Sequence, residues 1–388
     1  MATTDPTPGE DAGITLTRYA ASLQFDDLPP AVVSKVKELI LDSIGVAFAG
    51  SIAPSIDQSL AAGAELLCRM GHARRRGQEF LPTGTCAGMA AAATAARLIE
   101  LPFEGVLDAC GIAYSQCATN MQPLIEGATI KRFHAGFAAR NGVVSATLAR
   151  HGLTGAQNCL EGRLGYYNLY EGGDYDPANL TTELGQRHEV LDVAIKPWPS
   201  ARDNHGAVEA ALILADENDV NVEEISEIEV TLSPNAFSLS GKLWAEADGH
   251  PVVEAIASAA YCIAVVLLHG ELVLDDFMEE RIADPQVDQL ARRIRVGLVP
   301  GFDDPVMLAP QGLKLSMEDS RVLERQIGVL KGHPSRPMTD AEIERKFHHC
   351  CGFSARPVSN ARAEEIIHAV RNLEHLGDVR ELGDLIAL

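Results

Sequence analysis

Apolar residues recur at helical spacing through most of the first 170 residues of the chain. The stretches with this pattern are 14–22, 28–50, 60–77, 83–101, 103–118 and 134–152. A return every three or four positions is typical of amphipathic helices. The stretch 28–50 also has prolines near its start and Gly50 at its end, which are common boundary signals. No stretch before about Tyr170 alternates as a strand does, so the pattern predicts a helical first part.

The pattern changes after about Gly185. Three stretches alternate or are rich in β-branched residues, which is typical of strands; they are 188–200, 225–233 and 292–301. The stretch 313–332 predicts a hairpin that turns at "EDS". Helices are predicted at 204–219, 251–270, 339–353 and 360–378. The first strand, the helix that follows it and the second strand suggest a β-α-β unit.

These elements predict a mainly α protein with an inserted α+β domain. We expect residues 1–186 and 338–388 to form a large helical domain built from both termini, and residues 187–337 to form the smaller α+β domain. A length of 388 residues suits two domains, or one large domain with an insertion.

Composition narrows the class of protein. The chain is 46% hydrophobic and 22% charged, an ordinary globular balance, and its net charge of -22 argues against a nucleic-acid partner. The eight cysteines have no CxxC and no metal-like spacing; Cys110, Cys117 and Cys262 lie in apolar runs, as buried reduced thiols do. The acidic N-terminus is unlike a signal or transit peptide, and the longest apolar run, 255–268, is too short to span a bilayer. We therefore expect a reduced, cytoplasmic protein without a membrane partner.

A cationic cluster stands out against this acidic background. The segment "IKRFHAG" places Lys131, Arg132 and His134 within four positions. Arginine offers a planar fork to a carboxylate and lysine a compact charge, and a helix that starts here would add its free N–H groups and its dipole. The segment is either an anion-binding site or a solvated helix start.

A second cluster, "KPWPSARDNHG", sets Lys196, Arg202 and His205 around two prolines at a predicted strand-to-helix turn. His205 is either a general base or a simple helix-entry histidine. Tyr261 lies within an apolar helix, either as a proton donor or as a core residue whose hydroxyl group bonds a carbonyl. The run "HARRRG", 72–77, is most simply interpreted as an exposed helix end.

Signatures of common cofactors are absent from the sequence. There is no GxGxxG after a strand, no P-loop, no HExxH and no GxSxG. Acid–base chemistry by ordinary side chains is therefore the leading enzymatic hypothesis.

Seven stretches together resemble the MmgE/PrpD family, and the resemblance runs nearly end to end. They are "LPPAVVSKVKELILDSIGVAFAGS", "LPTGTCAG", "IKRFHAGFAARNGVVSATLARHGLTG", "LEGRLGYYNLYEGG", "KPWPSARDNHGAVEAAL", "ASAAYCIAVVLLHGEL" and "GHPSRPMTDAEIERKF". The family includes 2-methylcitrate dehydratase, cis-aconitate decarboxylase and iminodisuccinate epimerase, which act on small di- and tricarboxylates. The resemblance implies a homodimer with a helical domain from both termini, a smaller α+β domain, and no metal or organic cofactor.

The resemblance also implies roles for particular residues. Lys131 matches the active-site lysine of the family, Lys196 and Tyr261 fall on positions associated with the pocket, and His205 falls on a recurrent histidine. The predicted catalytic residues are Lys131, His205 and Tyr261, and the predicted substrate-binding residues are Arg132, His134, Lys196, Arg202 and Thr83.

Two departures from the family pattern leave two hypotheses open. The chain is shortened near residues 55–65, where family members carry a catalytic aspartate and histidine, and Leu81 stands where a histidine often precedes "PTG". The first hypothesis is a cofactor-independent lyase or isomerase (a dehydratase, decarboxylase or epimerase). The second is a catalytically degenerate member that keeps an anion site or serves a structural role.

Overall fold

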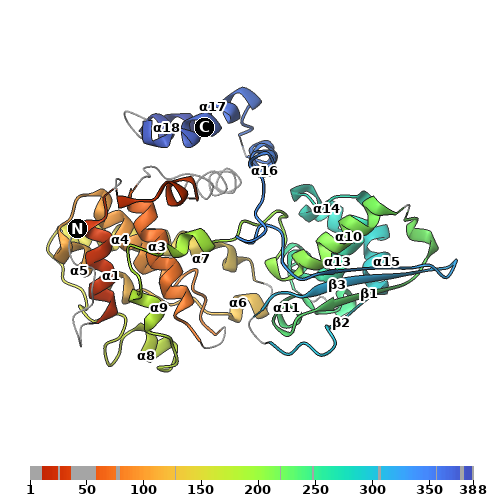
Figure 1. Cartoon of the computed structure of the whole chain (residues 1–388), viewed down its shortest axis with the longest axis horizontal. Coiled ribbons are helices and arrows are strands. Elements are labelled where there is room, and N and C mark those ends of the chain that lie inside the picture. The colour runs from red at the N-terminus through yellow and green to blue at the C-terminus, as the bar shows by residue number, and fades with distance from the viewer. Residues whose placement is uncertain are drawn as a thin grey trace. The chain divides into compact units, whose positions relative to one another are not determined.

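The structure, a computed structural model, describes residues 11–24, 27–35, 58–75, 79–126, 128–218, 220–246, 249–304, 307–354, 356–375 and 380–386 (Figure 1). Its α-helices are α1 (Ala12–Ser22), α3 (Gln58–His72), α4 (Cys86–Leu98), α5 (Phe103–Tyr114), α6 (Gln122–Ile125), α7 (His134–Arg150), α8 (Tyr166–Tyr170), α9 (Ala178–Thr181), α10 (His205–Glu217), α11 (Pro234–Ser240), α12 (Pro251–Ala257), α13 (Ala259–His269), α14 (Glu279–Ile282), α15 (Pro285–Arg293), α16 (Asp340–Gly352), α17 (Asn360–Arg371) and α18 (Arg380–Ile386). The strands are β1 (Ile225–Leu232), β2 (Ile294–Leu298), β3 (Gln311–Met317) and β4 (Val322–Ile327).

The predicted fold class is confirmed: helices dominate, and the strands form one small mixed sheet. Contacts divide the chain into two compact units. Unit 1 comprises Met1–Ile125, Ile130–Val193 and Phe347–Leu388, and unit 2 comprises Glu126–Thr129 and Ala194–Lys346. The domain boundaries expected from the sequence, at 186/187 and 337/338, stay a prediction. Of the predicted helix 28–50, residues 30–35 are helical, and the rest lies outside the described residues.

Helix α4 lies at the centre of unit 1 and packs against α3, α5 and α7. It runs antiparallel to α5. The Cys110 thiol lies 3.7 Å from the carbonyl oxygen of Met89, and the Cys117 thiol, just past the end of α5, lies 3.1 Å from that of Thr85, at the start of α4. All four residues are buried.

Helix α7 is also antiparallel to α5. The Gln116 amide, near the end of α5, donates a hydrogen bond of 2.9 Å to the Ser145 hydroxyl group, whereas Gly111 packs against Ala156, beyond the end of α7. Helices α4 and α7 are therefore parallel, and their N-terminal ends lie at the same end of the bundle.

A buried ion pair ties α3 to the chain that follows α9. Arg69 Nε donates to Glu65 Oε1 at 2.7 Å, and the two side chains are 1% and 3% exposed. The guanidinium group also donates to the carbonyl oxygens of Thr182 and Arg187, at 2.9 and 2.8 Å. Glu65 Oε2 accepts from the backbone N–H of Val190 at 3.1 Å.

The predicted strand at 188–200 is wrong. Residues Glu189–Asp192 form a 3₁₀-helix, η3. The backbone N–H of Val190 bonds the Glu65 carboxylate, and that of Ile195 bonds the carbonyl oxygen of Gly332, so neither needs a neighbouring strand. The predicted β-α-β unit is consequently wrong as well, because no strand precedes α10 in the described chain.

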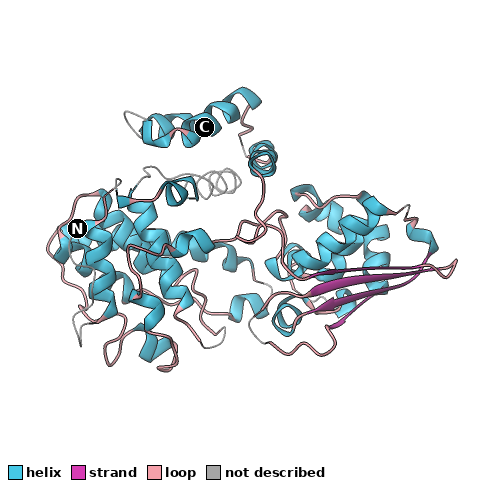
Figure 2. Ribbon diagram, viewed as in Figure 1, coloured by secondary structure: helices cyan, strands magenta, loops and turns pink. Residues whose placement is uncertain are grey.

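The sheet of unit 2 has the order β2-β1-β3-β4. Strand β1 is parallel to β2 and antiparallel to β3, and β3 and β4 form the predicted hairpin. Alternate residues of β1, such as Ile228 and Val230, are buried on the face that helices cover (Figure 2). The opposite face carries the cross-strand pair of Lys314 and Glu229, at 2.7 Å. One apolar and one polar face is the usual arrangement for an antiparallel sheet.

The predicted helix 251–270 is two helices, α12 and α13, which bend by 82° at Ser258. The Ser258 hydroxyl group caps α13 by accepting from the backbone N–H of Tyr261 at 3.1 Å. No single helix of the described chain is long and apolar enough to cross a membrane, and α12 and α13 reach that length and composition only as a bent pair.

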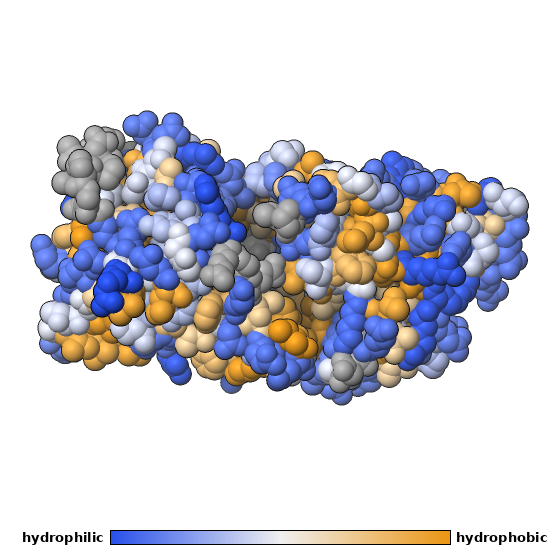
Figure 3. Space-filling model, turned by 90° about the horizontal axis from the view of Figure 1, so that it is seen from below, coloured by the Kyte–Doolittle hydropathy of each residue, from blue (hydrophilic) through white to orange (hydrophobic). Residues whose placement is uncertain are grey.

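The burial of the cysteines and the hydrophilic character of the surface agree with what the composition predicts. Cys110, Cys117 and Cys262 are buried and free, as predicted. Much of the face seen in Figure 3 is hydrophilic, interrupted by groups of hydrophobic residues.

Candidate active site

Lys131 and Arg132 lie in a 3₁₀-helix, η2 (Thr129–Phe133), that runs directly into α7. Both side chains are exposed, and neither makes a hydrogen bond or an ion pair with any residue that the structure describes. In contrast, Arg75 of unit 1 is exposed but bonds the Asp176 carboxylate at 2.7 Å. The positive charges of Lys131 and Arg132 are therefore available to an external anion.

His134 is the first residue of α7 and is 5% exposed. Its Nδ1 atom has no hydrogen-bond partner among the described residues. Burial, with a smaller contribution from the charge of Lys131, lowers the pKa of His134 below its usual value. The imidazole is therefore neutral at pH 7 and adds a hydrogen-bonding group, but no charge, to the cationic segment.

Thr83 is exposed in a turn that leads into α4. Gly142 of α7 packs against Ala91 of the parallel helix α4, and α-helices rise equally per residue. The start of α7 therefore lies level with the turn that carries Thr83. The N-terminal residues of both helices lack a side-chain cap, and the positive ends of the two helix dipoles add to the field of Lys131 and Arg132.

The second predicted cluster lies in unit 2. Lys196 is exposed and its Nζ donates to the carbonyl oxygen of Ser200 at 3.3 Å. Arg202 is half-buried; its Nη1 lies 2.6 Å from the carbonyl oxygen of Lys331 and 3.3 Å from His205 Nδ1. Because a guanidinium group can only donate, His205 Nδ1 is the acceptor and the ring proton lies on Nε2.

His205 begins α10 and is fully buried. Its Nε2 atom has no partner among the residues described. Burial, and then the charges of Arg202 and Lys196, lower the pKa of His205 well below its usual value, so the ring is neutral. Next to it, Gln311 Oε1 accepts from the backbone N–H of Ala207 at 3.0 Å and caps the helix. Nothing in the sequence indicated this role of Gln311, which lies on β3.

Tyr261 is also fully buried, and its hydroxyl group donates to the carbonyl oxygen of Asp276. Burial raises the pKa of this phenol. Its ring packs against Trp244 and Phe277, with centroids 5.0 and 6.0 Å apart. This is the arrangement of the second alternative considered for Tyr261, a core residue bonded to a carbonyl.

The structure thus places the predicted residues in two groups. Thr83, Lys131, Arg132 and His134 belong to unit 1, and Lys196, Arg202, His205 and Tyr261 belong to unit 2.

The interpretation of "HARRRG" as an exposed helix end is wrong for Arg74. Its Nε donates to Glu171 Oε1 at 2.5 Å, and the two side chains are 12% and 1% exposed. Arg75 is exposed, as predicted, and Arg76 lies outside the described residues. The partners Arg74 and Glu171 are far apart in sequence, so no local pattern could reveal this pair.

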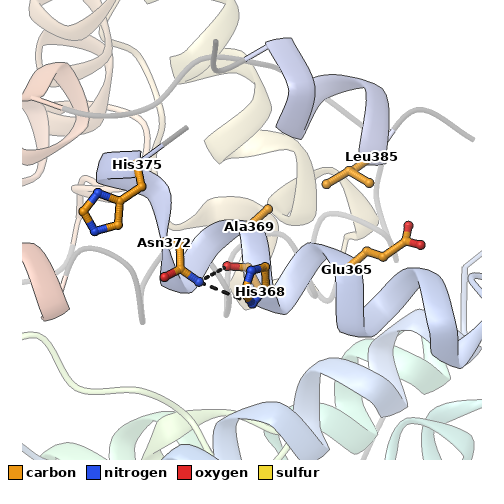
Figure 4. A pocket seen from close by; sticks show the side chains of 6 residues that line it. All are labelled: Glu365, His368, Ala369, Asn372, His375 and Leu385. Carbon is orange, nitrogen blue, oxygen red and sulfur yellow. Dashed lines mark hydrogen bonds between the residues drawn. The ribbon is translucent and has the colours of Figure 1, made fainter. Parts of the chain in front are cut away.

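The described residues contain no group of His, Cys, Asp or Glu side chains that could hold a metal ion. A wide, open pocket of about 490 Å³ lies at the end of α17 (Figure 4). It is lined by Glu365, His368, Ala369, Asn372, His375 and Leu385. None of the predicted site residues lines it, and it offers neither lysine nor arginine to an anion.

A helical unit and a smaller unit with a mixed sheet are the architecture expected above. In unit 1, Lys131 and Arg132, which have no partner among the described residues, lie at the start of α7. Comparison with known proteins identifies the family: the MmgE/PrpD N-terminal domain matches residues 58–178 and the MmgE/PrpD C-terminal domain matches residues 198–374. The chain belongs to the MmgE/PrpD family.

Three known relatives are all named after the decarboxylation of cis-aconitate. The cis-aconitate decarboxylase-like protein oryM of Aspergillus oryzae is 29% identical over 338 residues, which cover 84% of this chain and 67% of the relative. The cis-aconitate decarboxylase of Aspergillus terreus is 26% identical over 405 residues, covering 97% of this chain and 80% of the relative. The human cis-aconitate decarboxylase is 25% identical over 319 residues, covering 80% and 63%.

Proposed function

We propose that this protein is a lyase that acts on a small di- or tricarboxylate without a metal or organic cofactor, and that its reaction is the decarboxylation of cis-aconitate. The names of the relatives support the reaction class. The observation that carries the proposal is the pair of exposed cations, Lys131 and Arg132, left without a carboxylate partner in the described part of a chain of net charge -22.

The chemistry of a polycarboxylate explains the use of these cations. Loss of CO2 breaks a carbon–carbon bond and leaves its electron pair on the remaining skeleton, where it spreads towards neighbouring carboxylate oxygens until a proton takes it up. Removal of a proton beside a carboxylate, the first step of dehydration or epimerisation, builds the same charge. A fixed ammonium group such as that of Lys131 stabilises this charge, and the fork of Arg132 suits a second carboxylate.

Other predicted residues keep subsidiary roles in the proposal. Thr83 contributes a hydroxyl group at the same end of the bundle, and neutral His134 contributes an unpartnered ring nitrogen. Lys196 and Arg202 stay predicted substrate-binding residues. His205 and Tyr261 stay predicted proton-handling residues.

One observation favours a second candidate, a family member that binds an anion without turning it over. His205 and Tyr261 are both fully buried, and the hydroxyl group of Tyr261 is bonded to a carbonyl oxygen. Leu81, in the turn before α4, has no proton to exchange. In this candidate the cationic segment still binds an anion, but no side chain is placed to transfer a proton.

Turnover separates the two candidates. The purified protein is incubated with cis-aconitate, 2-methylcitrate, citrate and iminodisuccinate in turn, and products are followed by NMR. We expect cis-aconitate to lose CO2. Binding of citrate in a calorimetric titration, with no turnover of any of the four compounds, would instead support the second candidate. If the protein neither turned over nor bound any of the four compounds, both candidates would be overturned.

We also propose that the protein is a homodimer, as the family resemblance implies. Light scattering coupled to gel filtration should then give twice the 41.5 kDa mass of one chain. A mass of one chain at micromolar concentration would refute this.

A further inference from the structure

The turn that carries Thr83 is held in place by hydrogen bonds to its backbone. We call residues Glu79–Thr85 the Thr83 turn. The carbonyl oxygen of Leu81 accepts from the hydroxyl groups of Thr85 and Thr119, both at 3.1 Å. The backbone N–H of Leu81 donates to the carbonyl oxygen of Thr119 at 3.2 Å. The backbone is fixed while the Thr83 side chain remains exposed.

Arg74 bonds the same turn from the other side. Its Nη2 atom donates to the carbonyl oxygen of Phe80 at 3.2 Å, while its Nε atom donates to Glu171. The Tyr166 hydroxyl group donates to the same Glu171 oxygen at 2.9 Å and lies 3.4 Å from the Thr85 hydroxyl group. The charge pair therefore contacts the turn directly at Phe80, and Tyr166, which is bonded to Glu171, lies against its other end at Thr85.

We propose that Arg74 is a positioning residue that holds the Thr83 turn level with Lys131 and His134 at the start of α7. The inference rests on the proposed function only for the identity of the anion; the positioning itself follows from the contacts. Arg74 does not touch the anion. Its guanidinium group orients the turn through Phe80, and Glu171 and Tyr166 fix the guanidinium group.

The geometry requires arginine at this position. The guanidinium group presents separate N–H donors to a carboxylate and to a carbonyl oxygen. A lysine has one nitrogen atom on a flexible stem and cannot reproduce the fork. Arg74→Lys therefore keeps the charge beside Glu171 but loses one of the two contacts.

The neighbouring residue is a matched control. Arg75 also forms an ion pair with an acidic residue of the segment after α8, Asp176, but its side chain is 58% exposed and that of Asp176 is 30% exposed. Arg75 makes no hydrogen bond or ion pair with the Thr83 turn among the described residues. Arg75→Lys thus makes the same chemical change on the surface.

The first test does not depend on substrate. Hydrogen exchange of the amides of Leu81, Gly84 and Thr85, which are all bonded within or beside the turn, is measured in the wild type and in both variants. Loss of a hydrogen bond from a charged donor should speed exchange in Arg74→Lys by roughly ten- to a hundredfold. Arg75→Lys should match the wild type. Equal exchange in Arg74→Lys and Arg75→Lys would overturn the proposal.

The second test links the turn to the anion. Citrate affinity, measured by calorimetry, should fall about tenfold or more in Arg74→Lys and in Thr83→Ala, and the double variant should bind no more weakly than the weaker single variant, because both changes act through one turn. Citrate affinity should also fall in Tyr166→Phe, which keeps the ring but removes the bond to Glu171. Faster exchange with unchanged citrate affinity would show that the turn does not serve the anion site, and would also overturn the proposal. If the wild type bound citrate but turned over no substrate, only the proposed reaction would fail.

Discussion

Gly142 of α7 lies against Ala91 of α4 so closely that a Cβ atom on Gly142 would be 2.6 Å from both the carbonyl carbon and the Cβ atom of Ala91. The backbone of α4 cannot move aside to make room for this atom, as the end of a flexible side chain could. We expect Gly142→Ala to lower the free energy of unfolding by about 1–3 kcal/mol, as overpacking does.

Gly71→Ala in α3 is the matched control. A Cβ atom there would meet no atom within 4 Å, and alanine favours helix over glycine. Thermal unfolding of both variants measures the difference. If Gly142→Ala had the same melting temperature as the wild type, the close approach of α4 and α7 would be refuted.

Lys131→Ala should weaken citrate binding and leave the fold intact, because the side chain is exposed and has no bond to any described residue. A charge-assisted hydrogen bond contributes about 1.5–3 kcal/mol, or roughly ten- to a hundredfold in affinity. Lys131→Arg should recover part of this loss, since a planar fork does not fill the place of an ammonium group. Calorimetry gives the affinity and the melting temperature is the control; equal affinity in wild type and Lys131→Ala would mean that the segment is a solvated helix start.

Arg69→Ala should be far more damaging than Arg75→Ala. Removing Arg69 leaves Glu65 charged and 3% exposed, and breaking a buried pair in this way costs about 3–5 kcal/mol. The pair of Arg75 and Asp176 lies at the surface, where such pairs contribute about 0–1 kcal/mol. Denaturant unfolding compares the two variants, and similar losses would contradict the buried role of Arg69.

Stability should fall as the pH drops from about 7.5 to about 5.5, the range in which an ordinary histidine with a pKa near 6.5 takes up its proton. Burial lowers the pKa values of His134, His188 and His205 in the folded protein. In this range the unfolded chain therefore binds more protons than the folded chain, and the free energy of unfolding rises with pH.

The variant His205→Asn isolates one of these residues. The amide oxygen of asparagine can accept from Arg202 as Nδ1 does, but it does not titrate. Melting temperatures across the same pH range should vary less in His205→Asn than in the wild type. An unchanged slope would show that His205 does not titrate on unfolding.

Tyr261→Phe should reduce stability, and its turnover number separates the two alternatives for Tyr261, because only a core residue leaves turnover unchanged. The hydroxyl group is bonded to the carbonyl oxygen of Asp276, and such a bond contributes about 0.5–1.5 kcal/mol. Chemical unfolding and steady-state kinetics are measured on the same preparation. A large loss of turnover at unchanged stability would instead restore Tyr261 as a proton donor.

Elements that depend on local pattern were predicted well from the sequence. Helices α3, α4, α5 and α7 follow from apolar spacing, and the β3–β4 hairpin follows from two alternating runs around "EDS". The prediction of a strand at 188–200 was wrong because the pattern suits a strand, whereas the backbone bonds Glu65 and Gly332, which are distant in sequence. Long-range partners, not propensity, decide such a segment.

The candidate site divides in the same way. The exposure of Lys131 and Arg132 could be expected from a cationic run in an acidic chain. The roles of His205 and Tyr261 could not be predicted in this way, because the sequence left both alternatives open for each residue. The pair of Arg74 and Glu171 had no local signal, since it depends on how α3 packs against the segment after α8.

The position of β1 has a consequence for biosynthesis. It is an inner strand, and both of its neighbours, β2 and β3, are encoded after it. While the ribosome makes the intervening residues at roughly 5–20 per second, both edges of β1 stay unpaired for on the order of ten seconds. Unpaired edges can pair with other nascent chains, so we expect yield in a producing cell to depend on chaperones.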